Sequence, residues 1–161
     1  MADVVGVGFE AGALDALRTS IANSATFRTW TSTASVALAK VRAYRISLPV
    51  GSTTLPCALV DVGDAQHEAI ALGTSMSTGT LNVVFMMAAS DSHNDGDAAY
   101  TLLNASGEIV REMVEKVGTA ACLNIGAVRR TSKPERASED EETELGEDFY
   151  RIDYEVDFMG A

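Results

Sequence analysis

The side chains suited to chemistry are few and lie far apart in the sequence. The chain has two histidines, His67 and His93, and two cysteines, Cys57 and Cys122, both in apolar contexts. Because neither cysteine has a metal-binding partner at short spacing, both are interpreted as buried free thiols. The Gly-x-Ser-x-Gly, His-Glu-x-x-His and phosphate-loop motifs do not occur. The residues therefore predict no catalytic centre, no cofactor and no structural metal.

Two local patterns resemble ligand-binding motifs and are rejected on their context. A G-x-G-x-x-A pattern spans residues 6–11. A dinucleotide site would need a longer strand before it and an acidic residue about 20 positions later, and both are missing. Residues 91–97 resemble the start of a calcium loop, but Leu102 stands where that loop needs a bidentate glutamate. We interpret residues 1–10 as a flexible leader and residues 91–97 as a turn that leads into a helix.

The strongest structural pattern is a strand, a turn and a helix between Gly79 and Gly118. Residues 80–89 alternate with period two, which is typical of a strand. Residues 98–117 place apolar side chains, Leu103 and Val114 among them, on or beside one helical stripe. Since a helix cannot bury such a stripe alone, we expect it to pack on a sheet that contains the preceding strand.

The first half of the chain predicts one more helix and two strands. A helix is expected around Leu14–Ile21 and ends near Ser24, and Phe27 and Trp30 after it are expected to plug the edge of the core. Residues 34–40 are ambiguous and would suit a short helical turn. A strand with Tyr44, Ile46 and Leu48 on one face should end at Pro49, and a second should cover Pro56–Val62.

The remaining segments predict more strands and two loops. Residues 63–78 are expected to hold a short edge strand and a loop, which includes His67. Residues 120–128 read as a strand that carries two arginines at its end. Residues 135–148 contain eight acidic residues and one arginine, so a solvated loop is expected there. Residues 150–158 alternate most clearly of all, with one apolar and one charged face.

The expected fold is α+β, with a single mainly antiparallel or mixed sheet, helices packed on one face and a long acidic loop before the C-terminal strand. We expect one domain over residues 1–161. No run is apolar and long enough to span a membrane, and the first residues lack a signal-peptide pattern. This composition predicts a cytosolic protein without membrane partners.

Charge is unevenly distributed along the chain. The net charge is −11, but residues 1–60 hold five basic and three acidic residues, whereas residues 61–161 hold seven basic and 20 acidic ones. This acidic balance argues against tight nonspecific binding of nucleic acid. It is compatible with repulsion of DNA, or with pairing to a basic patch on a neighbouring subunit.

The order of these elements resembles the tail terminator family of long-tailed bacteriophages. The resemblance covers nearly the whole chain and rests on arrangement rather than on a signature motif. The matching parts are the N-terminal helix, the Pro-started strand, the apolar strand, the long helix, the basic strand end and the aromatic-rich last strand: Leu14–Ile21, Pro56–Val62, Leu81–Ala89, Ala98–Val117, Arg129-Arg130 before Pro134, and Tyr150–Phe158.

The resemblance implies an α+β structural protein of the virion that forms a hexameric ring, is not an enzyme and carries no cofactor. Such a ring caps the tail tube at its head-proximal end and joins the tail to the neck of the head. The implied partners are other copies of the chain, the tail tube protein, a neck or head-completion protein, and genomic DNA that passes through the lumen without sequence recognition. Assembly would take place in the host cytoplasm.

Within this interpretation, two sets of charged residues are candidates for assembly contacts. The basic candidates for inter-subunit or inter-ring contacts are Arg42, Arg45, Arg129 and Arg130. The acidic candidates for the lumen or a neighbouring subunit are Glu139, Asp140, Glu141, Glu142, Asp153, Glu155 and Asp157. Two alternatives stay open: another neck component such as a head-completion or stopper protein, and a small cytosolic enzyme or ligand-binding domain.

Overall fold

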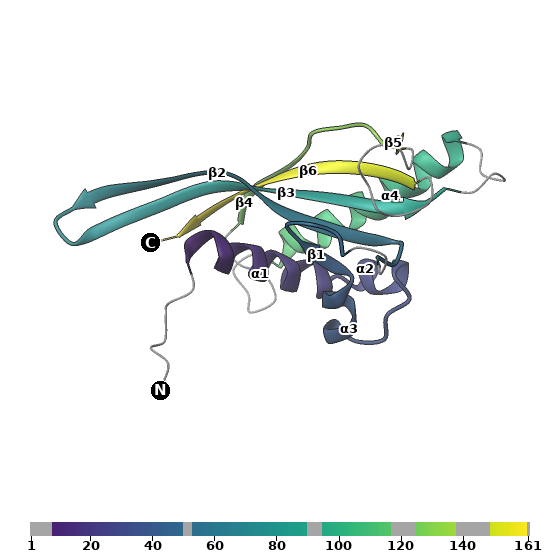
Figure 1. Cartoon of the computed structure of the whole chain (residues 1–161), viewed down its shortest axis with the longest axis horizontal. Coiled ribbons are helices and arrows are strands. Elements are labelled where there is room, and N and C mark those ends of the chain that lie inside the picture. Colours follow the sequence, from purple (N-terminus) through teal and green to yellow (C-terminus); the bar gives the residue numbers. More distant parts are fainter. Residues whose placement is uncertain (1–7, 50–52, 90–94, 117–124, 138–148, 161) are drawn as a thin grey trace.

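The computed structural model describes residues 8–49, 53–89, 95–116, 125–137 and 149–160. These residues form one mixed, mostly antiparallel six-stranded sheet with four helices packed against it, so the predicted α+β class is confirmed. The sheet runs along the long axis of the molecule, and α1, α2 and α3 lie beneath it in Figure 1. Among the described strands the order is β1-β2-β3-β6-β4, with β5 also paired to β6, and β1–β2 is the parallel pair.

The bounds of the elements follow the chain. The helices are α1 Phe9–Ala22, α2 Ala25–Trp30, α3 Val36–Val41 and α4 Asp95–Glu115. The strands are β1 Ala43–Arg45, β2 Cys57–Ala71, β3 Thr74–Ala88, β4 Ile125–Arg130, β5 Glu135–Ala137 and β6 Phe149–Gly160. None of these helices has the length and apolarity that crossing a bilayer requires.

The centre of the sheet is the β3–β6 pair, and its inner face forms the core. Ile152, Tyr154 and Val156 of β6 are buried, whereas the residues between them face the other side, which confirms the predicted alternation. They pair with the inner-facing residues of β3, such as Phe85 opposite Ile152. Full burial of an aliphatic or phenyl side chain stabilises by about 1.5–3 kcal/mol, so these residues supply much of the folding free energy.

Helix α4 covers this face, as the sequence predicts, but its buried stripe is rotated slightly. Leu102, Ile109 and Met113 are buried. Leu103 and Val114, which the pattern places with the buried residues, are 41% and 45% exposed. Ala98 and Ala105 are buried instead. Because their side chains are small, the helix can lie close to its neighbours.

The hairpin of β2 and β3 is much longer than predicted. Residues 63–78 were expected to form a short edge strand and a loop, and this prediction is wrong: the two strands continue to a turn at Gly73, which has φ +76°. Register shifts interrupt the pairing between Val62 and Ala65 and between Ala69 and Ala71. The far end of the hairpin extends beyond the helices (Figure 1). We call residues 64–78 the arm.

The N-terminal region is more helical than predicted. The expected leader ended at residue 10, but α1 already begins at Phe9, and residues 1–7 lie outside the described residues. Phe27 is buried and Trp30 is half-buried within α2, and Trp30 contacts Phe85 edge-on with a centroid distance of 6.3 Å. The prediction that both plug the core edge is thus confirmed. The ambiguous segment after them forms α3.

Strand β1 is shorter than predicted and faces the opposite way. It ends at Arg45, because Ile46 adopts φ +67° and is 58% exposed, whereas Ala43 is the buried residue. Tyr44 and Leu48 instead pack on a second, smaller apolar cluster formed by Cys57, Met86, Ala137 and Phe149.

The start of the predicted acidic loop also differs from expectation. Glu135–Ala137 forms β5, which pairs with β6, and Ala137 is buried in the second apolar cluster. Residues 138–148 lie outside the described residues.

Candidate assembly surface

The outer face of the sheet, away from the helices, carries charged side chains from β4 and β6. The register places Arg129 opposite Glu155. Arg129 donates hydrogen bonds to both carboxylate oxygens of Asp157, each at 2.8 Å, and also to Glu155. Further along β6, Arg151 donates to Asp153 at 2.9 Å. The predicted acidic row therefore exists, but its own chain supplies two arginines to it.

These contacts shift the acid–base equilibria of the row. The hydrogen bonds from Arg129 lower the pKa of Asp157 below its usual value. The hydrogen bonds to Asp157 and Glu155 raise the pKa of Arg129 in turn. Asp157 and Arg129 are therefore both charged near neutral pH. Because the group is largely exposed, it adds little to stability. It sets the charge pattern of the outer face, and the orientation of its acids toward a lumen or a neighbour stays a prediction.

The other predicted arginines have three different environments. Arg42 is used within its own chain: it donates to the carbonyl oxygens of Thr31 at 3.3 Å and Pro56 at 2.7 Å. Its buried Nε has no hydrogen-bond partner among the described residues. Arg45 is exposed at the end of β1, and its side chain has no hydrogen-bond or ion-pair partner in the described part of the chain. Arg130 is exposed and donates to the Ser132 carbonyl at 2.8 Å.

The structure does not place every predicted residue. Glu139, Asp140, Glu141 and Glu142 lie outside the described residues, as do Cys122 and His93. The structure brings Arg129 together with Glu155 and Asp157, whereas Arg42 and Arg45 lie near the opposite edge of the sheet, on or beside β1. The assembly roles of all these residues stay predictions.

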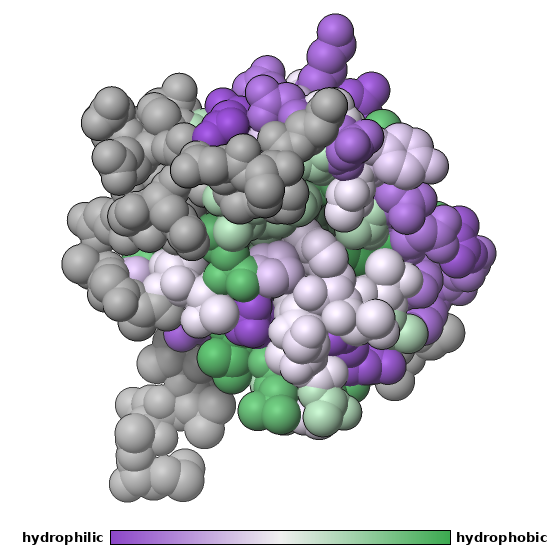
Figure 2. Space-filling model, turned by 90° about the vertical axis from the view of Figure 1, so that its right-hand side faces the viewer, coloured by the Kyte–Doolittle hydropathy of each residue, from purple (hydrophilic) through white to green (hydrophobic). Residues whose placement is uncertain are grey.

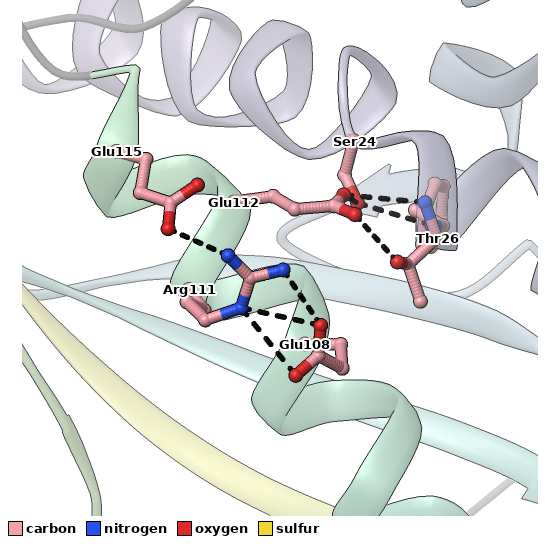
Figure 3. A network of polar contacts seen from close by, with 7 residues as sticks. Ser24, Thr26, Glu108, Arg111, Glu112 and Glu115 are labelled. Atoms are coloured by element: carbon pink, nitrogen blue, oxygen red, sulfur yellow. Dashed lines mark hydrogen bonds and ion pairs between the residues drawn. The ribbon is translucent and has the colours of Figure 1, made fainter.

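A half-buried carboxylate that the sequence pattern does not single out links α4 to α2. Glu112 accepts hydrogen bonds from the Ser24 hydroxyl, from the Thr26 hydroxyl at 2.6 Å and from the Thr26 backbone N–H at 3.2 Å (Figure 3). Burial raises the pKa of Glu112, but these hydrogen bonds outweigh it and leave the pKa below its usual value. By contrast, Arg111 points outward and pairs with Glu108 and Glu115. Glu112 is thus a structural anchor, visible only once the helices are packed.

Arg18 is a second anchor that the sequence does not reveal. Its Nε donates to the Ala43 carbonyl at 2.6 Å, and a terminal nitrogen donates to the Lys40 carbonyl at 3.1 Å. The guanidinium therefore fastens α1 to the end of α3 and the start of β1. Its spacing from these carbonyls, 22 and 25 residues, carries no local sequence signal.

The residues suited to chemistry that the structure describes do not gather in one place. His67 lies in β2 rather than in the predicted loop, and its Nδ1 is 2.7 Å from the Ser77 hydroxyl. Cys57 is a free, buried thiol, as predicted, and burial raises its pKa to about 12. Among the described residues no group of three or more His, Cys, Asp and Glu lies close enough to hold a metal ion.

A groove on the outer side of α4 has a volume of about 260 Å³. It is lined by Tyr100, Leu103, Asn104, Gly107 and Glu108. Its carboxylate is already paired with Arg111 at 2.8 Å, and Tyr100 and Leu103 are exposed. The groove therefore offers an apolar contact surface rather than a set of converging acids and bases.

Exposed apolar side chains also gather on the arm and on α3. On the arm, Ile70 is 60% exposed and Leu72 is fully exposed. On α3, Leu38 and Val41 are 56% and 64% exposed. Figure 2 views the end of the molecule opposite the arm, and apolar side chains line its lower edge, where α3 lies in Figure 1. Exposed apolar groups of this kind are typical of surfaces that bind another protein.

No protein-family model matches the chain, and no curated protein matches it.

Proposed function

We propose that this protein is a tail terminator of a long-tailed bacteriophage: it forms a ring, six copies in the family it resembles, on the head-proximal end of the tail tube and joins the tail to the neck. DNA passes through the lumen of the ring without sequence recognition. The protein acts by assembly and not by catalysis.

The observation that carries the proposal is the arm. A two-stranded ribbon that leaves the body of the domain packs little of its own apolar surface, and Ile70 and Leu72 face solvent in the single chain. Such a ribbon is stable when a neighbour covers it, since isolated hairpins are marginal in water. A contact between an arm and a different surface of the next copy is heterologous, and repeated heterologous contacts close into rings when the rotation allows.

The electrostatics also support assembly. The net charge of −11 disfavours tight binding of phosphate, which suits a lumen through which DNA slides. The groups suited to acid–base chemistry are dispersed, and the groove on α4 holds a carboxylate that is already paired.

A complementation experiment tests the proposal. Phage that lack this gene receive either the wild-type chain, the double variant Ile70→Ser/Leu72→Ser or the arm control Gln66→Ser. The double variant should keep the stability of the free chain, because both side chains are exposed, but should not restore joined particles. The control changes an exposed polar residue on the same arm and should restore them.

The readout is the tail-length distribution and the fraction of tails that carry heads, both from electron micrographs. Without the wild-type chain, tails should lose length control and should also fail to join heads. Normal lengths with heads attached would exclude the terminator role. Tails of normal length that lack heads would favour another neck component.

A further inference from the structure

Among the described strands, two edges of the sheet have no strand paired to them. On one side, β1 covers β2 only from Ala58 to Val60. From Asp61 to Ala71, no described strand pairs with that side of β2. On the other side, the described part of the chain pairs β4 with β6 alone, so the outer edge of Ile125–Arg130 is open. Open edges are templates for pairing with another strand.

The two open edges lie at the same height along the strands. The paired residues can be followed across the sheet at one level: Val128 lies opposite Val156, which lies opposite Leu81, which lies opposite Val62. One step away, Arg129 is level with Asp61 by the same route. The open edge of β2 therefore begins at the level that β4 occupies. A second copy placed beside the first, without sliding along the strands, brings these two edges together.

The strand directions also fit. β4 is antiparallel to β6, β6 to β3, and β3 to β2, so β4 runs antiparallel to β2 within one copy. Two copies in the same orientation would therefore pair β4 and β2 in antiparallel fashion, the more common arrangement between strands.

Backbone groups on both edges point outward. Thr131 N–H donates to the Asp153 carbonyl of β6, so the N–H of its neighbour Arg130 points to the open side. On β2, Ile46 N–H donates to the Val60 carbonyl, so the alternate residue Val62 also faces outward. The Val62 N–H is held by the Asp61 carboxylate at 2.8 Å, which places a negative charge on the edge itself.

Charge distinguishes the two edges. Residues 61–71 contain Asp61, Asp64 and Glu68 and no lysine or arginine. Residues 125–133 contain Arg129, Arg130 and Lys133 and no acid. Opposite charges on two edges favour the β4–β2 pairing over β4–β4 or β2–β2 pairing, and they fix the register more than they add affinity.

Apolar side chains complete the fit. Val62 is 38% exposed although it lies on the inner face of the sheet, and Val128 is half-buried on the same face. Pairing at the common level would set these two side chains side by side, so that the inner face of the sheet would stay apolar across the junction.

We infer that β4 of one copy pairs in antiparallel orientation with the open edge of β2 of a second copy, so that one sheet continues from subunit to subunit. The contact joins two different surfaces, so every copy can both donate and accept an edge. The inference rests on the self-association in the proposed function, but not on a role in the tail.

The first test removes one backbone donor. Val128, two residues before Arg130, faces the same open side and is level with Val62, where the open edge of β2 begins. Val128→Pro deletes this outward N–H, while Thr131 keeps its bond to β6, and proline is tolerated on such an edge. Val128→Ala is the matched control, because it shortens the side chain and keeps the N–H. Self-association is measured by sedimentation velocity and native mass spectrometry, and folding by circular dichroism.

Val128→Ala should weaken association less than about fivefold, because it loses only part of one apolar contact. Val128→Pro should weaken each contact a further ~10- to 100-fold, because the outward Val62 carbonyl of the second copy loses its donor. Equal association of the folded proline variant and the alanine control would overturn the inference.

The second test does not depend on the proline variant folding. In a chain with Cys57→Ala and Cys122→Ala, Val128→Cys is combined in turn with Val62→Cys, Ala65→Cys or His67→Cys, and the protein is oxidised. One combination should give a ladder of covalent oligomers. The β2 cysteine in that combination shows how far the two copies are shifted along the strands. Each single-cysteine chain is the control and should give no ladder.

The outcomes separate this inference from the proposed function. A ladder from a protein whose loss leaves phage particles normal would support the edge contact and exclude the terminator role. Assembled rings that yield no ladder in any combination would overturn the edge contact and leave the terminator role standing. A chain that stays monomeric alone and on tail tubes would overturn both.

Discussion

The carboxylate of Glu112 offers the sharpest test of how the helices are held together. Glu112→Gln keeps the size of the side chain but replaces one acceptor oxygen, which faces donors of Ser24 and Thr26, with an NH₂ group. Hydrogen bonds to a charged acceptor contribute about 1.5–3 kcal/mol each and neutral ones about 0.5–1.5 kcal/mol, so we expect a loss of about 1–3 kcal/mol at pH 7. For a chain of this size, each kcal/mol lowers Tm by about 2–4 °C.

The effect should depend on pH with a defined sign. The hydrogen bonds from Ser24 and Thr26 hold the pKa of Glu112 in the folded chain below its usual value of 4.5. Its contribution to stability is therefore fully present above that value and is lost as the pH falls through the folded pKa. Urea unfolding of wild type and Glu112→Gln should show the full difference in unfolding free energy at pH 7. The difference should shrink as the pH falls below 4.5.

Glu115→Gln is the matched control, because it makes the same Glu-to-Gln change on the same helix. Glu115 contacts Arg111 at 2.6 Å on the exposed side, so its replacement should cost much less. Two results would refute the reasoning. One is a difference between wild type and Glu112→Gln that stays constant from pH 7 to well below 4.5. The other is a Glu115→Gln variant as destabilised as Glu112→Gln.

Three further predictions use the core. Val156→Asp should unfold the domain, because it buries an unpaired charge at a fully buried position, and a soluble variant with unchanged melting would contradict the register of β6. Tyr154→Phe deletes a buried 2.9 Å hydrogen bond to Ser106 and should cost about 1 kcal/mol in urea unfolding, with Ser106→Ala/Tyr154→Phe no less stable than the single variant. Cys57, with its pKa raised to about 12, should resist a thiol reagent at pH 8 in a Cys122→Ser chain and react only after denaturation. Rapid labelling of the folded chain would contradict its burial.

The elements with one solvent-exposed and one buried face could be predicted from the sequence. The alternation in β6 reports directly which residues face the helices, since Glu155 and Asp157 cannot lie in the core. The sequence also predicts α4, but the predicted buried stripe is shifted by about one residue from the observed one. Alanine contributes little to a hydrophobic pattern, so the sequence favours the larger Leu103 and does not indicate that Ala98 and Ala105 are buried.

The arm could not be predicted, for a physical reason. Both of its faces are largely solvated, so its Ser, Thr and Gly residues show no apolar alternation and resemble a linker. The end of β1 was predicted wrongly for a different reason. The apolar alternation continues past Arg45 to Ile46, but the backbone turns out of the strand at Ile46.

The candidate site could be predicted only in part. The sequence selected Arg129 and the acids of β6, which the fold does bring together. It could not select Arg18 or Glu112, because their partners are backbone carbonyls, hydroxyls and an amide far away in the chain. It also missed the open edges of the sheet, since an edge is defined by strand order and not by any residue.

The most direct test of the central claim is an averaged electron-microscopy reconstruction of purified phage particles, with the protein located by a tag fused to the chain. We expect a six-fold ring of this protein between the last ring of the tail tube and the neck, with a continuous passage for DNA through its centre. Density for the tagged chain elsewhere in the particle, or particles that lack it and still join tails of normal length to heads, would contradict the claim.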